Sequence, residues 1–368
     1  GLRFGGHTRV APVLGAYDAY LSGAVAGPDE TQRGWDDPTV VLRLGASPTS
    51  KRLRTYLAAT DADQHVVDPT GRWREAAFTA TNLVVAEPSR LCARLARLIG
   101  GGGGDPAWRE QWLRAERIAT ALHRGDPSSV AADIAAAGTG GDVPTDVHEG
   151  TVLQTVAEAV PDPATVFVSN SMPVRDLDRF VPPSTTNLTA LGNRGVSGID
   201  GIVSSALGAG SATTDDLTLV VGDLALYHDS NGLLAVDRCA VDVTIVLINN
   251  DGGGIFHKLP VESFDPPFTD SFKTPHGLAF EPLSTLYGLE YVRIDAREAG
   301  SDTVGDTAAD DDGTDDPSAA LAAAYTHAHE TDGSHLIEVR TDAEASQRIR
   351  ERLLDAVERA VHGGDESS

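Results

Sequence analysis

Short apolar runs alternate with helix-like segments along most of the chain, and this pattern predicts an α/β protein. Two runs, residues 217–221 and 243–248, have the length and mainly apolar character of buried strands. A helix-like segment separates them, so together they form a predicted βαβ unit. The parallel strands of such a unit end at one edge of the sheet, where α/β proteins bind ligands.

Polar residues at the ends of these two runs form the main candidate site. The first run ends in a Gly-Asp pair, and the second ends in Asn-Asn-Asp followed by three glycines. We expect Asp223 and Asn250 to meet at the sheet edge. These two side chains and the carbonyl group of Gly252 offer the oxygen ligands that Mg²⁺ prefers, and glycine backbone can approach a phosphate closely. The pattern predicts a Mg²⁺–diphosphate clamp, with a purely structural turn as the alternative.

The wider pattern predicts two Rossmann-like domains with parallel sheets. We predict a first domain over residues 1–137, a linker over 138–147 and a second domain over 148–368, with an acidic, disordered insert at 297–317. The first domain lacks a G-x-G-x-x-G fingerprint, so no dinucleotide site is assigned to it. Further strands are predicted at 39–45, 64–68, 82–86, 165–168, 187–191 and 335–340, and helices at 50–59, 88–99, 108–122, 129–137, 148–160, 318–329 and 343–361.

Three local expectations concern a helix cap, a loop and the cysteines. Ser197 is predicted to cap a helix that runs through Ala209. The segment 260–275 is predicted to be a long loop that serves as a lid or a subunit contact. Cys92 and Cys239 lack metal-ligand spacing, and we expect both to be buried and structural in a reducing cytoplasm.

The net charge of the chain limits the classes of partner that we expect it to bind. Of 368 residues 41% are hydrophobic, enough for full cores, but the net charge is −25. Nucleic acid is not an expected partner, because phosphate backbones bind basic surfaces. So acidic a composition is typical of a halophilic archaeon, with an ordinary acidic bacterial protein as the alternative. No apolar run reaches membrane-spanning length and no signal peptide is visible, which favours a cytoplasmic protein without a membrane partner.

A few basic and polar side chains mark further candidate site residues. Lys51 and Arg52 fall in the first turn of a predicted helix, where they form either an anion site or a solvated helix start. Ser171 and Arg175 follow the strand at 165–168, and Arg194 follows the strand at 187–191. Arginine side chains at strand ends suit carboxylate ligands, with a structural salt bridge as the alternative.

Four motifs in order resemble a known enzyme family. The Gly-Asp and Asn-Asn pairs resemble the cofactor motif of thiamine-diphosphate enzymes in general. The segments SNSMPVRDLD, GNRGVSGIDGIVSSALG, GDLALYHDSNGLLAV and NNDGGGIFHKLP resemble the MenD family, the 2-succinyl-5-enolpyruvyl-6-hydroxy-3-cyclohexene-1-carboxylate synthases of menaquinone biosynthesis. Weaker similarity in LRLGASPTSKRL and HLIEVRTD extends the resemblance over nearly the whole chain.

This resemblance implies a reaction and an assembly. It implies thiamine diphosphate and Mg²⁺, or Mn²⁺, as cofactors for decarboxylation of 2-oxoglutarate and addition of the succinyl carbanion to isochorismate. Family members are homodimers or homotetramers with three domains, of which this chain resembles the central and the diphosphate-binding domains. The N-terminal pyrimidine-binding domain, with its activating glutamate, is absent, so we expect a fragment or a chain that needs a partner polypeptide. The alternatives are an acetolactate-synthase-like carboligase and a non-catalytic cofactor-binding subunit.

The resemblance also implies roles for individual residues. The implied metal ligands are Asp223, Asn250 and the carbonyl group of Gly252. The implied substrate and active-site contacts are Ser171, Arg175, Arg194, Lys51 and Arg52. The implied cofactor contacts are Ser169, Asn170, Ile199, Gly222, Asp223, Leu224, Ala225, Asn250, Gly252, Gly253, Ile255, Phe256 and Leu259. The family usually has serine where this chain has Ala225, so one hydroxyl contact near the diphosphate is lost.

Overall fold

The computed structural model describes residues 13–21, 36–75, 77–100, 104–136, 147–297 and 316–362. These residues divide into two compact units. The N-terminal unit comprises Leu14–Val143 together with the end of the chain from Leu353, and the C-terminal unit consists mainly of Pro144–Arg352. All of the predicted linker but its last residue, and most of the predicted acidic insert, lie outside the described residues.

A three-stranded parallel sheet organises the N-terminal unit, in the order β1-β2-β3. Ser50 caps α2 by accepting a hydrogen bond from the backbone N–H of Leu53. The helices bury one core cluster, which includes Tyr20, Ile118 and Val357. The elements are β1 Val40–Leu44, β2 Asp63–Val67, β3 Asn82–Val84, α1 Tyr17–Tyr20, α2 Lys51–Ala59, α3 Pro88–Ile99, α4 Pro106–His123, η4 Pro127–Val130, α5 Ala131–Ala136 and the end of α13 Ala343–His362.

The C-terminal unit is built on a six-stranded sheet in the order β5-β4-β6-β7-β9-β8, and all its pairings are parallel. With two parallel sheets, the predicted α/β fold with two Rossmann-like parts is confirmed. The strands are β4 Ala164–Val168, β5 Leu188–Leu191, β6 Asp216–Gly222, β7 Thr244–Asn249, β8 Glu290–Asp295 and β9 His335–Arg340. The helices are α6 Glu149–Ala159, α7 Pro173–Phe180, α8 Ile202–Gly210, α9 Asp223–His228, η5 Ser230–Leu233, α10 Leu234–Cys239, η6 Gly254–Lys258, η7 Pro260–Ser263, η8 Thr269–Lys273, α11 Glu281–Tyr287, α12 Pro317–Glu330 and most of α13.

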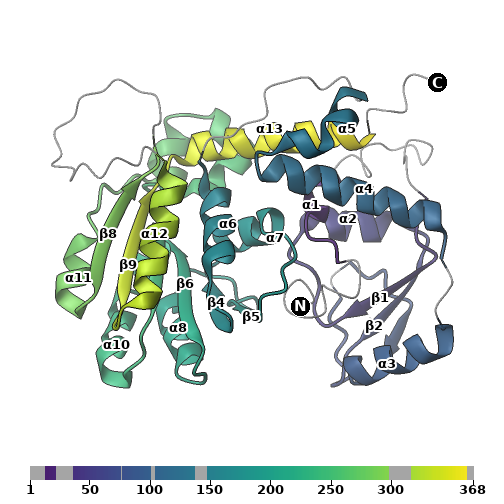
Figure 1. Ribbon diagram of the computed structural model, residues 1–368, viewed down its shortest axis with the longest axis horizontal. Coiled ribbons are helices and arrows are strands. Elements are labelled where there is room, and N and C mark those ends of the chain that lie inside the picture. Colours follow the sequence, from purple (N-terminus) through teal and green to yellow (C-terminus); the bar gives the residue numbers. More distant parts are fainter. Residues whose placement is uncertain are drawn as a thin grey trace. The chain divides into compact units, whose positions relative to one another are not determined.

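Both faces of this sheet carry a hydrophobic core. On one face Leu219 and Leu247 pack with residues of α8 and α9, and on the other Val220 and Val246 pack with residues of α6 and α12. Figure 1 shows α12 running beside β9. All residues of β7 are buried, as expected for a parallel strand covered on both faces. The two central strands are therefore a rigid base for the residues that follow them.

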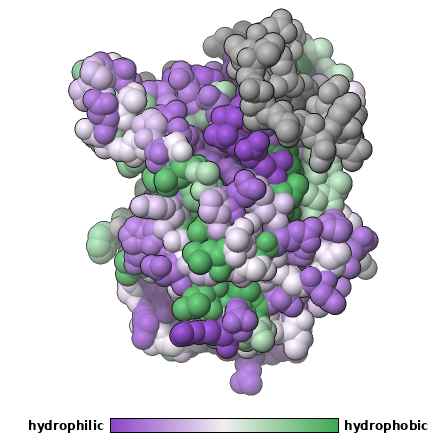
Figure 2. All heavy atoms as spheres, turned by 90° about the vertical axis from the view of Figure 1, so that its left-hand side faces the viewer, coloured by the Kyte–Doolittle hydropathy of each residue, from purple (hydrophilic) through white to green (hydrophobic). Residues whose placement is uncertain are grey.

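The edge strand β8 is much less buried than the centre. Most residues of β8 are exposed, and Val292 in β8 and Leu286 in α11 are 39% and 69% exposed. Figure 2 shows the side of the molecule that carries these elements, where hydrophobic residues gather among hydrophilic ones. Within the described residues, no helix combines the length and the apolar character that crossing a membrane requires.

Several local predictions were wrong. Helix α8 begins at Ile202 rather than after Ser197, because the chain enters it through Gly201 in the left-handed conformation (φ 65°) without a side-chain cap. One helix was predicted between β6 and β7, but the segment is divided into α9, η5 and α10. The turn at η5 packs closely on α8, since a Cβ at Gly232 would lie 2.7 Å from the Ser204 Oγ.

Other corrections concern exposure and elements that were not predicted. Cys92 and Cys239 are exposed rather than buried, because each falls on the solvent side of its helix. The predicted loop at 260–275 contains two short helical segments, η7 and η8. The strand β8 and the helices α7 and α11 were not predicted, because β8 is mostly exposed and the two helices span only 8 and 7 residues.

Candidate metal and ligand site

The carboxyl edge of the six-stranded sheet holds a cavity of about 600 Å³. The residues that follow β4, β6 and β7 line it, so the predicted meeting of Asp223 and Asn250 is confirmed. The predicted site residues in this lining are Ser169, Asn170, Ser171, Arg175, Arg194, Ile199, Gly222, Asp223, Leu224, Ala225, Asn250, Gly252, Gly253, Ile255 and Phe256. Leu259 is not in the lining and is 46% exposed.

Asp223 is a buried carboxylate held by backbone and by a histidine. Its Oδ1 accepts a hydrogen bond from the N–H of Leu224 at 2.6 Å. Its Oδ2 accepts from the N–H of Gly252 at 2.9 Å and lies 3.1 Å from the Nε2 of His276. Burial raises the pKa of Asp223, and these hydrogen bonds oppose the rise. The carboxylate is therefore fixed in orientation at the carboxyl end of β6.

His276 is a site residue that the sequence did not reveal. Its Nδ1 accepts a hydrogen bond from the N–H of Leu278 at 3.0 Å, so Nε2 carries the proton that faces Asp223. The side chain of Asp251 also accepts from the N–H groups of His276 and Gly277, at 3.0 and 2.7 Å. The only signal in the sequence was a histidine directly after the long segment 260–275.

The two adjacent asparagines after β7 differ in their hydrogen bonding. Asn249 is satisfied at both ends of its amide, since Nδ2 donates to Glu338 at 2.6 Å and Oδ1 accepts from the N–H of Asp251 at 3.2 Å. The Nδ2 of Asn250 donates to Glu149 at 2.6 Å. Its Oδ1 is buried and has no hydrogen-bond partner among the described residues. A buried acceptor without a partner is costly, so this oxygen is suited to a ligand such as a cation.

The glycines after Asn250 have a packing role. Gly252 has a φ of 132°, and a Cβ there would lie 2.1 Å from the carbonyl oxygen of Lys273. A Cβ at Gly253 would lie 2.5 Å from the carbonyl oxygen of Phe272. The N–H of Gly253 donates to Lys273 at 2.7 Å. The close approach of the 272–273 backbone therefore requires these glycines whether or not a phosphate binds.

Two arginines give the cavity positive charge. The Nη1 of Arg194 donates to the Oδ1 of Asn170 at 2.6 Å, and the Nδ2 of Asn170 donates to the carbonyl group of Gly198 at 2.7 Å. Arg175, on α7, donates to the carbonyl group of Ser171, whose φ is 69°. Because guanidinium groups bind carboxylates through paired hydrogen bonds, this end of the cavity suits an acidic ligand.

Lys51 and Arg52 belong to the N-terminal unit. Lys51 is exposed in the first turn of α2. The Nη1 of Arg52 donates to the carbonyl group of Asp18 at 3.0 Å and lies 3.6 Å from its carboxylate. Arg52 thus already has an anionic neighbour, whereas Lys51 extends from the helix start.

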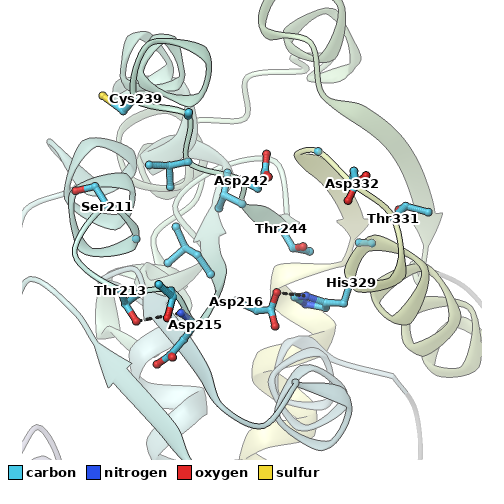
Figure 3. Close-up of a pocket in the computed structure, with 18 residues that line it drawn as sticks. Ser211, Thr213, Asp215, Asp216, Cys239, Asp242, Thr244, His329, Thr331 and Asp332 are labelled. Atoms are coloured by element: carbon cyan, nitrogen blue, oxygen red, sulfur yellow. Dashed lines mark hydrogen bonds and ion pairs between the residues drawn. The ribbon is translucent and has the colours of Figure 1, made fainter.

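A second pocket, of about 440 Å³, lies at the amino edge of the same sheet. Figure 3 shows Asp216 and His329 facing each other in this pocket, and their nearest side-chain atoms are 3.9 Å apart. Asp215, Asp242 and Asp332 also line it. Among the described residues, no cluster of three or more His, Cys, Asp or Glu side chains is placed to hold a metal ion, and this pocket is no exception.

Comparison with known proteins identifies relatives over almost the entire chain. The chain is 67% identical to a 2-succinyl-5-enolpyruvyl-6-hydroxy-3-cyclohexene-1-carboxylate synthase of Halorubrum lacusprofundi, over 99% of this chain and 57% of that protein. Proteins of the same name from Haloquadratum walsbyi and Roseiflexus castenholzii are 50% and 39% identical, over 97% of this chain and 56% and 53% of their own lengths. No family model matches the chain.

These relatives confirm the resemblance that the four motifs predicted. The chain spans about half the length of the curated relatives it matches. Several of them come from halophilic archaea, in agreement with the acidic composition.

Proposed function

We propose that this chain, a homologue of the MenD synthases over nearly all of its length, forms the Mg²⁺- and diphosphate-binding part of a thiamine-diphosphate enzyme. The proposed reaction is the decarboxylation of 2-oxoglutarate and the addition of its succinyl group to isochorismate. The single observation that supports this best is the unpartnered, buried Oδ1 of Asn250 in the same cavity as the carboxylate of Asp223.

The donor set fits a hard divalent cation. Mg²⁺ prefers oxygen ligands, usually takes few of them from protein and leaves other positions to phosphate and water. Asp223, the Oδ1 of Asn250 and the carbonyl group of Gly252 would supply three oxygens from residues that meet at one point of the sheet edge. Thiamine diphosphate, when bound, would supply the electron sink for decarboxylation of a 2-oxo acid.

Other residues of the cavity would bind and orient the reactants. Arg175 and Arg194 would bind the carboxylates of 2-oxoglutarate and isochorismate, and Ser171 would hydrogen-bond to them. Asn170 would keep the guanidinium group of Arg194 in place through the bond at 2.6 Å.

Apolar residues would shape the rest of the cavity. Ile199, Ile255 and Phe256 line the cavity and would exclude water from the reacting groups. Ala225 offers no hydroxyl group, so the diphosphate would rely more on backbone N–H groups. An active site of this kind would be completed by a pyrimidine-binding domain and by a second copy of the chain.

The test is reconstitution in concentrated KCl. The chain is mixed with a polypeptide that corresponds to the N-terminal part of the Halorubrum relative, together with thiamine diphosphate and Mg²⁺. We expect 2-oxoglutarate to be consumed only when isochorismate is also present. Consumption of pyruvate instead would support an acetolactate-synthase-like carboligase. Tight cofactor binding without consumption of either 2-oxo acid would support a non-catalytic subunit and contradict the synthase.

A further inference from the structure

A buried ionic cluster lies behind the cavity. Arg350 of α13 donates through Nε and Nη2 to the carboxylate of Asp176 at 3.0 and 2.6 Å, and through Nη2 to Glu149. All three side chains are at most 2% exposed. Burial alone would lower the pKa of Arg350, but the charges of Asp176 and Glu149 outweigh it and raise that pKa. The guanidinium group is therefore a permanent cation that holds two carboxylates in place.

Such a cluster is a poor source of stability. Removing charged groups from water is costly, so a buried ion pair often stabilises a protein no more than hydrophobic residues of similar volume would. A buried ionic cluster is better explained by a role in holding a functional side chain in one arrangement. Glu149 is the member of the cluster that touches a candidate ligand residue, and it also lines the cavity.

The two oxygens of Glu149 have different partners. Oε2 accepts from Arg350, and Oε1 accepts from the Nδ2 of Asn250 at 2.6 Å. A carboxylate can only accept hydrogen bonds, so the amide of Asn250 must turn its nitrogen toward Glu149. Its oxygen then points away from Glu149, and this is the buried atom without a partner among the described residues.

We propose that Glu149, held by Arg350, is a positioning residue that orients Asn250 so that its amide oxygen faces the cation. This inference rests on the proposed function, because it assigns the cation to the same cavity. Residues that orient metal ligands in this way typically change metal affinity about 10- to 100-fold when they are mutated.

Glu149→Gln tests the orientation directly. The introduced glutamine would turn its NH₂ either toward the Arg350 guanidinium or toward Asn250, and in the second case Asn250 would present nitrogen to the cation. We expect the Mn²⁺ affinity of the chain, measured by electron paramagnetic resonance with thiamine diphosphate present, to fall about 10- to 100-fold. The gain in Tm on adding Mn²⁺ and thiamine diphosphate should shrink with it.

The double variant Glu149→Gln with Asn250→Asp distinguishes positioning from a structural role. In this variant the introduced glutamine accepts from Arg350 through its amide oxygen. Its NH₂ donates to the introduced aspartate, whose second oxygen is free for the cation. The donor and acceptor roles are exchanged while the net charge is unchanged. We expect Mn²⁺ affinity to return to within about 5-fold of the original value. Because its hydrogen bonds are complete, this variant also serves if the single variant fails to fold.

A matched control and the outcomes complete the test. Glu262 accepts from Arg348 of the same helix α13 at 2.8 Å and pairs with His257, outside the ligand set. Glu262→Gln should leave Mn²⁺ affinity within about 2-fold. If the unmodified chain binds no Mn²⁺, the proposed function fails. If it binds Mn²⁺ and Glu149→Gln binds equally well, or the double variant binds no better than Glu149→Gln, the positioning role is wrong and the proposed function stands.

Discussion

The two edges of the six-stranded sheet both carry aspartates, but they differ in how these aspartates are held. At the carboxyl edge, the side chain of Asp223 is 4% exposed and bound by two backbone N–H groups and His276. At the amino edge, the side chain of Asp216 is 56% exposed and its histidine partner lies 3.9 Å away. The first carboxylate is fixed before any ligand arrives, whereas the second is free to move in water.

This difference shows that the number of acidic groups does not identify a cation site. The amino-edge pocket has four aspartates in its lining, yet they form no metal-binding cluster among the described residues. The carboxyl edge offers one carboxylate, one amide oxygen and one backbone carbonyl group, but a buried guanidinium cluster and packed glycines hold them. Protein groups that are already held in place bind a cation better, because little ordering remains to be done on binding.

The largest expected effect comes from removing the fixed carboxylate. Asp223→Ala should abolish measurable binding of Mn²⁺ with thiamine diphosphate, a loss of more than about 1,000-fold, because the only carboxylate of the ligand set is gone. Titration calorimetry on the chain would measure it. The matched control is Asp216→Ala at the amino edge, for which we expect a change below about 2-fold. Equal losses in the two variants would remove the distinction between the edges.

Packing of the glycine loop gives the next effect. Gly252→Ala should lower the free energy of unfolding by about 3 kcal/mol, since its φ of 132° and the carbonyl oxygen of Lys273 both oppose a side chain. Urea denaturation of the cofactor-free chain measures this change. Gly222→Ala is the control, because a Cβ there meets no atom within 4 Å, and it should cost less than about 0.5 kcal/mol. A neutral Gly252→Ala would show that the loop is not packed as described.

The arginines test the charge of the carboxyl edge. Arg194→Ala should raise the KM of the reconstituted enzyme for its acidic substrates about 10- to 100-fold, through loss of charge-assisted hydrogen bonds. Arg293, exposed on β8, provides the control, and Arg293→Ala should leave KM within about 2-fold. An unchanged KM in Arg194→Ala would remove this residue from the proposed substrate site.

The smallest effect belongs to the amino edge. Burial, and to a lesser degree the charge of His335, lowers the pKa of His329, and Asp216 opposes this. Because the folded state favours neutral His329, its contribution to stability is present above the unfolded pKa of about 6.5 and is lost as pH falls below it. His329→Gln should therefore lose less Tm on acidification than the original chain and keep its Mn²⁺ affinity at neutral pH. His327→Gln, at an exposed position, should show no such change.

The pattern of hydrophobic and polar residues predicted most of the fold, because the order of these residues within a segment largely decides whether it forms a helix or a strand. The limits of α3 and β9 agree with the predicted segments, and the buried strands β6 and β7 were found from apolar runs alone. The exposed strand β8 was missed, since half-exposed edge strands lack such runs. The prediction that Ser197 caps a helix was wrong, because α8 begins after a left-handed Gly201 instead.

Only those residues of the candidate site that lie in short sequence motifs were predicted. Asp223 and Asn250 were found together because parallel topology brings strand ends to one edge. Glu149 and Arg350 were missed, because they lie 201 positions apart and nothing local marks their contact. Exposure of Cys92 and Cys239 was also missed, since a helix-like pattern does not say which face meets solvent.

A crystal structure of the chain grown with Mn²⁺ and thiamine diphosphate tests the central claim most directly. Anomalous scattering locates the metal without reference to any assumed site. We predict one manganese peak within bonding distance of the Asp223 carboxylate and the Oδ1 of Asn250. A peak among Asp215, Asp216 and Asp242 at the amino edge, with none at the carboxyl edge, would contradict the account.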